Sequence, residues 1–289
     1  MSLAQVEKTL TAKLHNAHHV MTLDIERLPG RAIHKHRGLT IEGDFWDLNS
    51  WKHTLGYRIP PEAVVEWPRT ICVAWQEYGK KRVEFASEWD DGRDQMLARV
   101  WEAYDRAHLV YGHNVDRFDT RNLNAEWLTM GLNPPAPFKI LDTLKEARRT
   151  FGFESNTLAS LTTRLGIDTK TDKYSVEMAR AACAGDKAQQ RKLKAYNVGD
   201  IHASREFVDR LRGWIPSHPH SMIGTIDDRP TCNQCWGDNL KPNGTRLAQQ
   251  IVFKLWRCQD CGANVSGLRH SRAAVTRGAR TMNTGGSRS

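Results

Sequence analysis

Four carboxylates on three separated segments constrain most strongly how this chain can fold. Asp24 and Glu26 lie two positions apart in Thr-Leu-Asp-Ile-Glu-Arg, Asp119 ends Gly-His-Asn-Val-Asp-Arg-Phe-Asp, and Asp200 ends Tyr-Asn-Val-Gly-Asp. Convergent carboxylates repel one another and are costly to hold together unless a cation lies among them. Hard oxygen ligands suit Mg²⁺ or Mn²⁺, and pairs of these ions are widely used to cleave phosphodiesters. The sequence therefore predicts a fold that joins the three segments, and a metal-dependent nuclease.

Asp24 and Glu26 are expected at the end of a buried strand over residues 19–25. Side chains at i and i+2 of a strand point to the same face, so the two carboxylates project together. Tyr196 and Asp200 are four residues apart on a predicted helix and share a face of it. A strand end and a helix can thus meet at one edge of a sheet.

Asp119 is placed where a short strand over residues 109–111 gives way to a helix that begins near Phe118. Each acidic segment also has a simpler interpretation. An acidic pair on a strand is more often a solvated edge, a tyrosine on a helix more often packs, and Asp119 could simply cap its helix. Order, spacing and local structure agree for all three segments, which favours the metal site.

The periodicities along the rest of the chain predict an α/β fold, in which helices pack on a mixed sheet. The segment 27–67 is rich in glycine and proline and is expected to be mostly loop. The other expected elements begin with a hairpin over 70–77 and 81–86 and helices over 91–108 and 118–131. A strand over 138–141 is followed by a helix through 149 and by a helix over 156–165 capped by Asn156. A last helix carries residues from Tyr196 to Trp214.

Three segments resemble the exonuclease motifs of the DnaQ-like 3′–5′ exonuclease superfamily: Asp24-Ile25-Glu26, Asn114-x-x-x-Phe118-Asp119 and Tyr196-x-x-x-Asp200. The first two are closest to the proofreading domains of family B DNA polymerases. The third matches the tyrosine-bearing branch, since the histidine-bearing branch would place its histidine where this chain has Ala195. The resemblance covers residues 19–212 and implies a ribonuclease H-like fold. No polymerase domain follows, so we expect a free-standing enzyme of the kind that tailed bacteriophages encode.

The resemblance implies a role for each matching residue. Two Mg²⁺ or Mn²⁺ ions would activate water and stabilise the leaving 3′ oxygen, and nucleoside 5′-monophosphates would be released. Tyr196 would orient the attacking water, because its ordinary pKa near 10 makes it a poor base at neutral pH. Phe118 is assigned to substrate binding, and Asn114 either contacts substrate or braces its loop. The metal ligands implied are Asp24, Glu26, Asp119 and Asp200.

A second metal site is predicted near the C-terminus. Cys232-Asn-Gln-Cys235 and Cys258-Gln-Asp-Cys261 form two CxxC pairs, which is the spacing that closes four thiolates around one structural Zn²⁺. The module resembles a zinc ribbon, and the alternative is a redox dithiol pair. Its expected partner is nucleic acid, with a DNA polymerase or another replication protein as the second choice.

Composition supports this organisation and a nucleic-acid partner. The net charge is +9, much of it in the arginines of the tail, although a basic tail also occurs on unrelated proteins. We expect an N-terminal extension over 1–18, the exonuclease domain over 19–214, a linker over 215–230, the zinc ribbon over 231–265 and a basic disordered tail over 266–289. The sequence shows no signal peptide or membrane span, which favours a cytoplasmic protein without a membrane partner.

Three functions remain compatible with these patterns. The leading one is a 3′–5′ exonuclease for single-stranded DNA in replication proofreading or repair. The same carboxylates and tyrosine would serve an exoribonuclease, and a non-catalytic nucleic-acid adaptor would rely on the zinc ribbon alone. Trp46, Trp51 and Trp67 could stack on unpaired bases, although burial is the commoner fate of a tryptophan.

Overall fold

The protein is described by a computed structural model, which covers residues 19–36, 38–50, 59–167, 173–215, 232, 237–248 and 251–266. The chain divides into two compact units, one spanning His19–Phe207 and the other containing the residues from Val208 onward. Within the described ranges, no helix combines the length and the apolar character needed to cross a bilayer.

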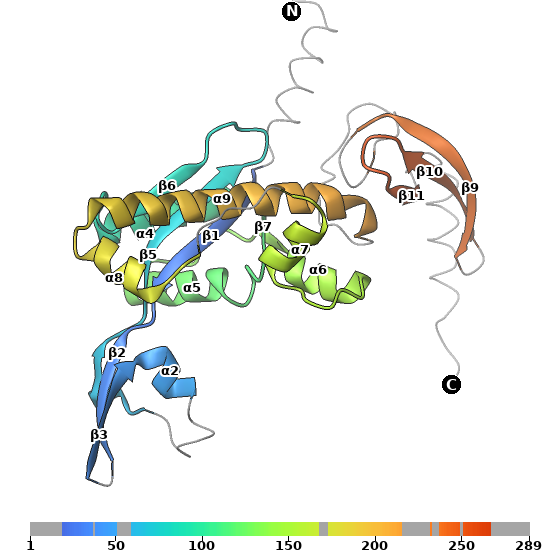
Figure 1. Cartoon of the computed structure of the whole chain (residues 1–289). Helices are drawn as coiled ribbons and strands as arrows, with labels where there is room; N and C mark the ends of the chain where they lie inside the picture. The colour runs from blue at the N-terminus through green and yellow to red at the C-terminus, as the bar shows by residue number, and fades with distance from the viewer. Residues whose placement is uncertain are drawn as a thin grey trace, which may run out of the picture. The chain divides into compact units, whose positions relative to one another are not determined.

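A five-stranded mixed sheet forms the centre of the first unit (Figure 1). Its strand order is β6-β5-β1-β7-β8. The central strand β1 pairs antiparallel with β5 and parallel with β7. The predicted hairpin is the antiparallel pair β5 and β6, and β8 extends the parallel half. The strands are β1 (Val20–Leu28), β5 (Arg69–Glu77), β6 (Glu84–Ser87), β7 (Leu109–Gly112) and β8 (Lys139–Asp142).

Helices cover both faces of this sheet. Leu23 and Ile25 belong to the core that contains Val100 of α4 and Leu123 of α5. The other face packs against α8 and α9, where Cys72 of β5 meets buried apolar residues of both helices. The helices are α4 (Arg93–Arg106), α5 (Asp119–Thr129), α6 (Thr143–Thr150), α7 (Leu158–Arg164), α8 (Val176–Cys183) and α9 (Lys187–Leu211), followed by the 3₁₀ turn η2 (Arg212–Trp214).

The prediction that segment 27–67 is mostly loop was wrong. Its described part forms a second sheet, in the order β3-β2-β4, with its own small core of Ala32, Leu48, Ile59 and Ala63. Gly30 lies directly before this sheet and has a φ of +74°, a conformation that glycine adopts more readily than other residues. A Cβ at this position would also approach the Glu66 carbonyl oxygen to 2.4 Å. The elements are β2 (Arg31–His36), β3 (Leu39–Asp44), α2 (Phe45–Ser50), η1 (Pro61–Ala63) and β4 (Val64–Glu66).

Two smaller differences concern helices. Helix α7 begins later than predicted, because Thr157 caps it by accepting a hydrogen bond from the Ser160 amide. The Asn156 carbonyl instead lies 2.9 Å from Nε2 of His113. Helix α8 was not predicted, and its cap is Ser175, whose side chain accepts from the Met178 amide.

The second unit contains a small antiparallel sheet in the order β11-β10-β9. Its strands are β9 (Leu240–Ala248), β10 (Ile251–Cys258) and β11 (Asn264–Ser266). The mixed sheet with its helices and this C-terminal sheet confirm the predicted α/β class with a small additional module. The predicted extension over 1–18 and almost all of the predicted linker and tail lie outside the described residues, so the domain limits stay a prediction.

Candidate active site

Strand β1 presents Asp24 and Glu26 on the face of the sheet opposite α4 and α5. In the register with β5, Asp24 lies beside Ala74 and Glu26 beside Cys72. The register shifts between Glu26 and Arg27, which marks a β-bulge or a similar irregularity before the pairing with β5 continues to Leu28. Bulges of this kind often lie next to active sites, because they redirect the side chains around them. Alternation along β1 therefore places two carboxylates together, as the sequence predicted.

Helix α9 supplies the third carboxylate, Asp200. One carboxylate oxygen each of Asp24, Glu26 and Asp200 lies within 4.8 Å of the others. Tyr196, one turn earlier on α9, makes a side-chain hydrogen bond with Asp200. Segments of the chain that are more than 170 residues apart thus contribute to one acidic cluster, which is the arrangement that the spacing suggested.

Asn197 ties α9 to β1 and was missed by sequence reasoning. Its Nδ2 donates hydrogen bonds to the carboxylate of Asp24 at 2.7 Å and to the carbonyl oxygen of Asp24 at 3.2 Å. The side chain is fully buried. Its position three residues before Asp200 was the available signal, since i and i+3 on a helix share a face. Asn197 therefore positions Asp24 relative to the helix.

Asp119 does not belong to the group of three. It is the first residue of α5 and is 3% exposed, and its Oδ1 accepts a hydrogen bond of 3.0 Å from the Ile25 amide. This bond places Asp119 against the backbone between Asp24 and Glu26. Its role as a further metal ligand stays a prediction.

The electrostatics of the cluster favour a bound cation. Burial raises the pKa of Asp24 well above its usual value, and the carboxylates of Glu26, Asp119 and Asp200 raise it further. Burial likewise raises the pKa of Asp119 to about 7. Both shifts arise because a negative charge in this place is poorly solvated and lies among like charges. A cation bound between the carboxylates would offset both effects.

The loop between β7 and α5 is held by two polar anchors. The buried Asp142 carboxylate accepts amide hydrogen bonds from Asn114 at 3.0 Å and Asp116 at 3.3 Å. His113 lies 3.0 Å from the Thr143 hydroxyl and also contacts the Asn156 carbonyl, and burial lowers its pKa. These contacts give His113 a bracing role. Asn114 has a φ of 65°, a left-handed conformation that asparagine tolerates better than most residues.

Aromatic side chains border this loop. Trp46 of α2 lies edge-on to Phe118, with ring centroids 6.3 Å apart, and the Arg27 guanidinium lies 5.7 Å from the Trp46 ring centroid. Trp46 is half-buried, whereas Trp67 is 58% exposed and packs against Phe45. Trp51 lies outside the described residues.

A buried charge network lies next to the bulge of β1. Glu126 of α5 is 7% exposed and accepts hydrogen bonds from Arg27 at 3.3 Å and from Arg93 at 3.0 Å. The amide and hydroxyl of Thr70 donate to the same carboxylate at 2.8 and 2.9 Å. Glu126 thus links α4 and α5 to the strand that carries the acidic pair.

The cysteines of the C-terminal unit form a second cluster. The sulfur atoms of Cys232, Cys258 and Cys261 lie within 4.8 Å of one another. The Cys232 amide donates a hydrogen bond to the Gly237 carbonyl at 2.8 Å, and the Cys258 amide donates one to the Ala263 carbonyl at 2.9 Å. Cys235, the fourth predicted ligand, lies outside the described residues. The arrangement could hold a zinc ion.

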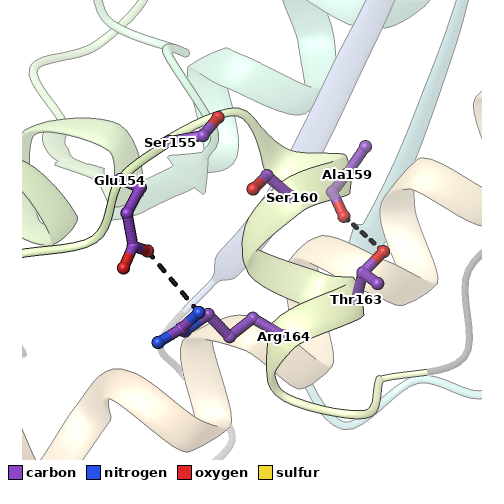
Figure 2. Close-up of a pocket in the computed structure, with 6 residues that line it drawn as sticks. All are labelled: Glu154, Ser155, Ala159, Ser160, Thr163 and Arg164. Carbon is purple, nitrogen blue, oxygen red and sulfur yellow. Dashed lines mark hydrogen bonds and ion pairs between the residues drawn. The ribbon is translucent and has the colours of Figure 1, made fainter.

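An open cavity of about 540 Å³ is lined by residues of α7 and of the segment just before it. Figure 2 shows its lining, in which Glu154 and Arg164 form an ion pair at 3.5 Å and the Thr163 hydroxyl donates to the Ala159 carbonyl. Its acidic and basic groups are paired with each other, and none of the predicted site residues lines it. We therefore assign it no part in the chemistry.

Comparisons with known proteins do not assign a function to this chain. No protein-family description matches the sequence, and no curated protein matches it. A solved structure of the family B DNA polymerase from the hyperthermophilic archaeon Pyrobaculum calidifontis is similar to 67% of this chain, with 13% identity and a TM-score of 0.47. The match covers 24% of the polymerase chain. At this identity and TM-score, the likeness by itself assigns neither fold nor activity.

Proposed function

We propose that the protein is a metal-dependent 3′–5′ exonuclease that releases nucleoside 5′-monophosphates from single-stranded DNA. The convergence of Asp24, Glu26 and Asp200 within 4.8 Å, with Tyr196 bonded to Asp200, is the observation that carries the proposal. Acidic residues that only lie on solvated edges of separate elements are not expected to converge, whereas these three come together from β1 and α9.

The donor set fits a hard divalent cation. All three ligand side chains offer carboxylate oxygens, and the raised pKa of Asp24 indicates that these oxygens repel one another without a cation. Mg²⁺ or Mn²⁺ held by these three residues, with Asp119 beside them, would activate water and stabilise the leaving 3′ oxygen.

Tyr196 and Asn197 are proposed to organise the reacting groups. Burial and the nearby carboxylates raise the pKa of Tyr196, so its hydroxyl keeps its proton and acts as a hydrogen-bond donor. A protonated phenol can orient the attacking water but cannot remove a proton from it. Asn197 fixes the orientation of the Asp24 carboxylate through its 2.7 Å hydrogen bond.

Trp46 and Phe118 are proposed to contact the bases at the 3′ end. Phe118 directly precedes Asp119, and Trp46 lies against it from α2. Stacking on aromatic rings tolerates every base, which suits an exonuclease that must remove each nucleotide in turn. Asn114 has its amide bound to Asp142, which supports the bracing role for its backbone.

The direct test uses single-stranded DNA and RNA of the same sequence, each labelled at the 5′ end. With Mg²⁺, a 3′–5′ exonuclease shortens the labelled DNA one nucleotide at a time and releases nucleoside 5′-monophosphates, and EDTA stops the reaction. A 3′-phosphorothioate linkage should block the first step. Faster cleavage of RNA would indicate the exoribonuclease alternative. Binding without cleavage of either strand would indicate the adaptor.

The variant Tyr196→Phe should lower turnover by roughly 10- to 1000-fold, because it removes only the hydroxyl that orients water. Metal binding, measured by titrating Mn²⁺, should persist because Tyr196 is not a proposed ligand. The measurement is single-turnover cleavage of a short oligonucleotide, where chemistry limits the rate. Unchanged single-turnover rates would make Tyr196 a packing residue.

The cysteine cluster is proposed to be a structural Zn²⁺ site. The sulfur atoms of Cys232 and Cys261 lie 3.6 Å apart. Four sulfurs around zinc, each bonded at ~2.3 Å, lie about 3.8 Å from one another, so this spacing fits a zinc tetrahedron. Cys235 is the proposed fourth ligand, and nucleic acid or a DNA polymerase remains the predicted partner of this zinc ribbon.

The variant Cys258→Ser should lose its zinc, because a neutral hydroxyl replaces a thiolate ligand. Metal analysis of protein prepared under reducing conditions measures this, with Cys183→Ser on α8 as the matched control that keeps its zinc. Mg²⁺-dependent cleavage of short oligonucleotides should survive in both variants, since every proposed catalytic residue lies before residue 208. Wild-type protein without zinc would contradict the proposed site.

A further inference from the structure

A cavity of about 360 Å³ lies between helix α6 and the loop that leads into Asp119. Its lining is basic, and no acidic side chain contributes to it. Three of its six residues are arginines and a fourth is a lysine, and all four basic side chains are exposed. The lining consists of Asn114, Arg117, Leu144, Lys145, Arg148 and Arg149.

Two of these cations are neutralised by neighbours and two are not. Lys145 pairs with Asp116, and Arg149 pairs with Glu146. Among the described residues, no carboxylate lies within ion-pair distance of the guanidinium groups of Arg117 and Arg148. The cavity therefore carries about two uncompensated positive charges, in a position where an anion could approach from solvent.

The loop geometry that shapes this cavity is fixed by buried contacts. The Asp142 carboxylate accepts the Asn114 and Asp116 amides and, at 3.0 Å, the Leu144 amide at the start of α6. One carboxylate thus fastens both walls of the cavity to each other. The backbone that carries the arginines is therefore already held in place. Ligand binding then costs less conformational entropy of the backbone.

The cavity is close to the proposed reaction centre. Arg117 precedes Asp119 by two residues, so their Cα atoms are at most about 7 Å apart. Arginine binds phosphate oxygens through two parallel hydrogen bonds, and a single DNA strand presents one phosphate for each linkage between nucleotides. A strand whose last phosphodiester reaches the acidic cluster could therefore place neighbouring phosphates at Arg117 and Arg148.

We propose that this basic cavity binds the phosphodiester backbone of the strand that is retained after cleavage. The inference rests on the proposed exonuclease function and specifies its substrate contacts. An enzyme that removes the 3′-terminal nucleotide holds the rest of the strand on the 5′ side of the scissile bond. Arg117 and Arg148 bind phosphates on that side, independently of base sequence, and hold the end of the strand in register with the acidic cluster.

The experiment compares the double variant Arg117→Gln/Arg148→Gln with Arg82→Gln/Arg106→Gln. The control pair removes the same charge at the opposite end of the strands, near the starts of β1 and β7, where Arg82 follows β5 and Arg106 ends α4. Binding of a fluorescent 12-residue oligothymidylate is measured in EDTA from 50 to 400 mM NaCl. Two lost phosphate contacts should make the slope of log affinity against log salt shallower by about 1.4, and weaken binding at 0.1 M salt about 25-fold.

A second substrate separates this inference from the proposed function. The p-nitrophenyl ester of thymidine 5′-monophosphate contains the scissile phosphodiester and no further phosphate. Its Mg²⁺-dependent hydrolysis by the double variant should stay within about twofold of wild type, because both arginines are exposed and touch no proposed ligand. Salt slopes equal to wild type, or equally reduced in both double variants, would overturn the basic cavity as a binding site. Failure of the wild-type protein to cleave any substrate contradicts the proposed function, while the salt slopes in EDTA still decide the role of the cavity.

Discussion

Asp24→Ala and Asp200→Ala should each remove nearly all cleavage, by at least about 10³-fold, while single-stranded DNA still binds. Both side chains belong to the group of three carboxylates, so either change removes a ligand from the proposed metal site. Stabilising the charge that develops on the reacting oxygens is commonly the largest catalytic contribution, and here it depends on that site. Cleavage of a 5′-labelled oligonucleotide, together with its binding in EDTA, measures both expectations.

The matched control is Glu102→Ala, an exposed carboxylate on α4, the helix that covers the other face of the sheet. It removes the same charge and should leave cleavage within about twofold of wild type. Activity of either aspartate variant within a few-fold of wild type would show that the acidic cluster is not the reaction centre.

Thermal unfolding of the same proteins gives an independent readout. The raised pKa of Asp24 means that, without metal, the folded state favours the protonated carboxyl. The contribution of Asp24 to stability is present below the pKa that its carboxyl has in the unfolded chain, and it is lost as the pH rises through the pKa of this carboxyl in the folded protein. Metal-free protein should therefore be less stable at pH 8 than at pH 5. Mg²⁺ should therefore raise the Tm more at pH 8 than at pH 5, and this increase should be much smaller in Asp24→Ala.

The acidic cluster could be anticipated from the sequence because each of its parts obeys a local rule. The period of two on β1 aligned Asp24 with Glu26, and the period of four on α9 aligned Tyr196 with Asp200. Local periodicity predicts which face of an element a residue occupies, and two such predictions, for β1 and α9, were enough to suggest one site.

The features that escaped prediction depend on contacts between distant segments. The third strand of the second sheet depends on β2 pairing with β4, between residues 32 and 35 positions apart, which no local pattern specifies. The role of Asp142 as the anchor of both the loop between β7 and α5 and helix α6 follows from the pairing of β7 with β8. Asn197 looked like an ordinary polar helix residue until the fold placed Asp24 beside it. Side chains that position others thus remain hidden until the tertiary structure is known.

Glu126→Ala should lower the free energy of unfolding by about 3–5 kcal/mol, a large share of the total for most domains. The change removes the acceptor for Arg27 and Arg93 and leaves the Arg27 side chain, which is 9% exposed, as a buried charge with less compensation. It also takes the hydrogen-bond partner from the Thr70 amide and hydroxyl. Urea unfolding measures the loss as a lower midpoint with an unchanged slope.

Two further variants test whether buried charge is the cause. Glu126→Gln keeps an acceptor for Thr70 and should cost less than Glu126→Ala. The double variant Arg27→Met/Glu126→Leu should regain much of the lost stability, because replacing both partners of a buried ion pair by apolar side chains leaves no unpaired charge. Arg27 directly follows Glu26 and lies over Trp46, so the double variant should still bind oligonucleotides more weakly, even where its stability is restored. A loss below about 1 kcal/mol in Glu126→Ala would show that the network contributes little, and that packing between α5 and the sheet holds the acidic strand in place.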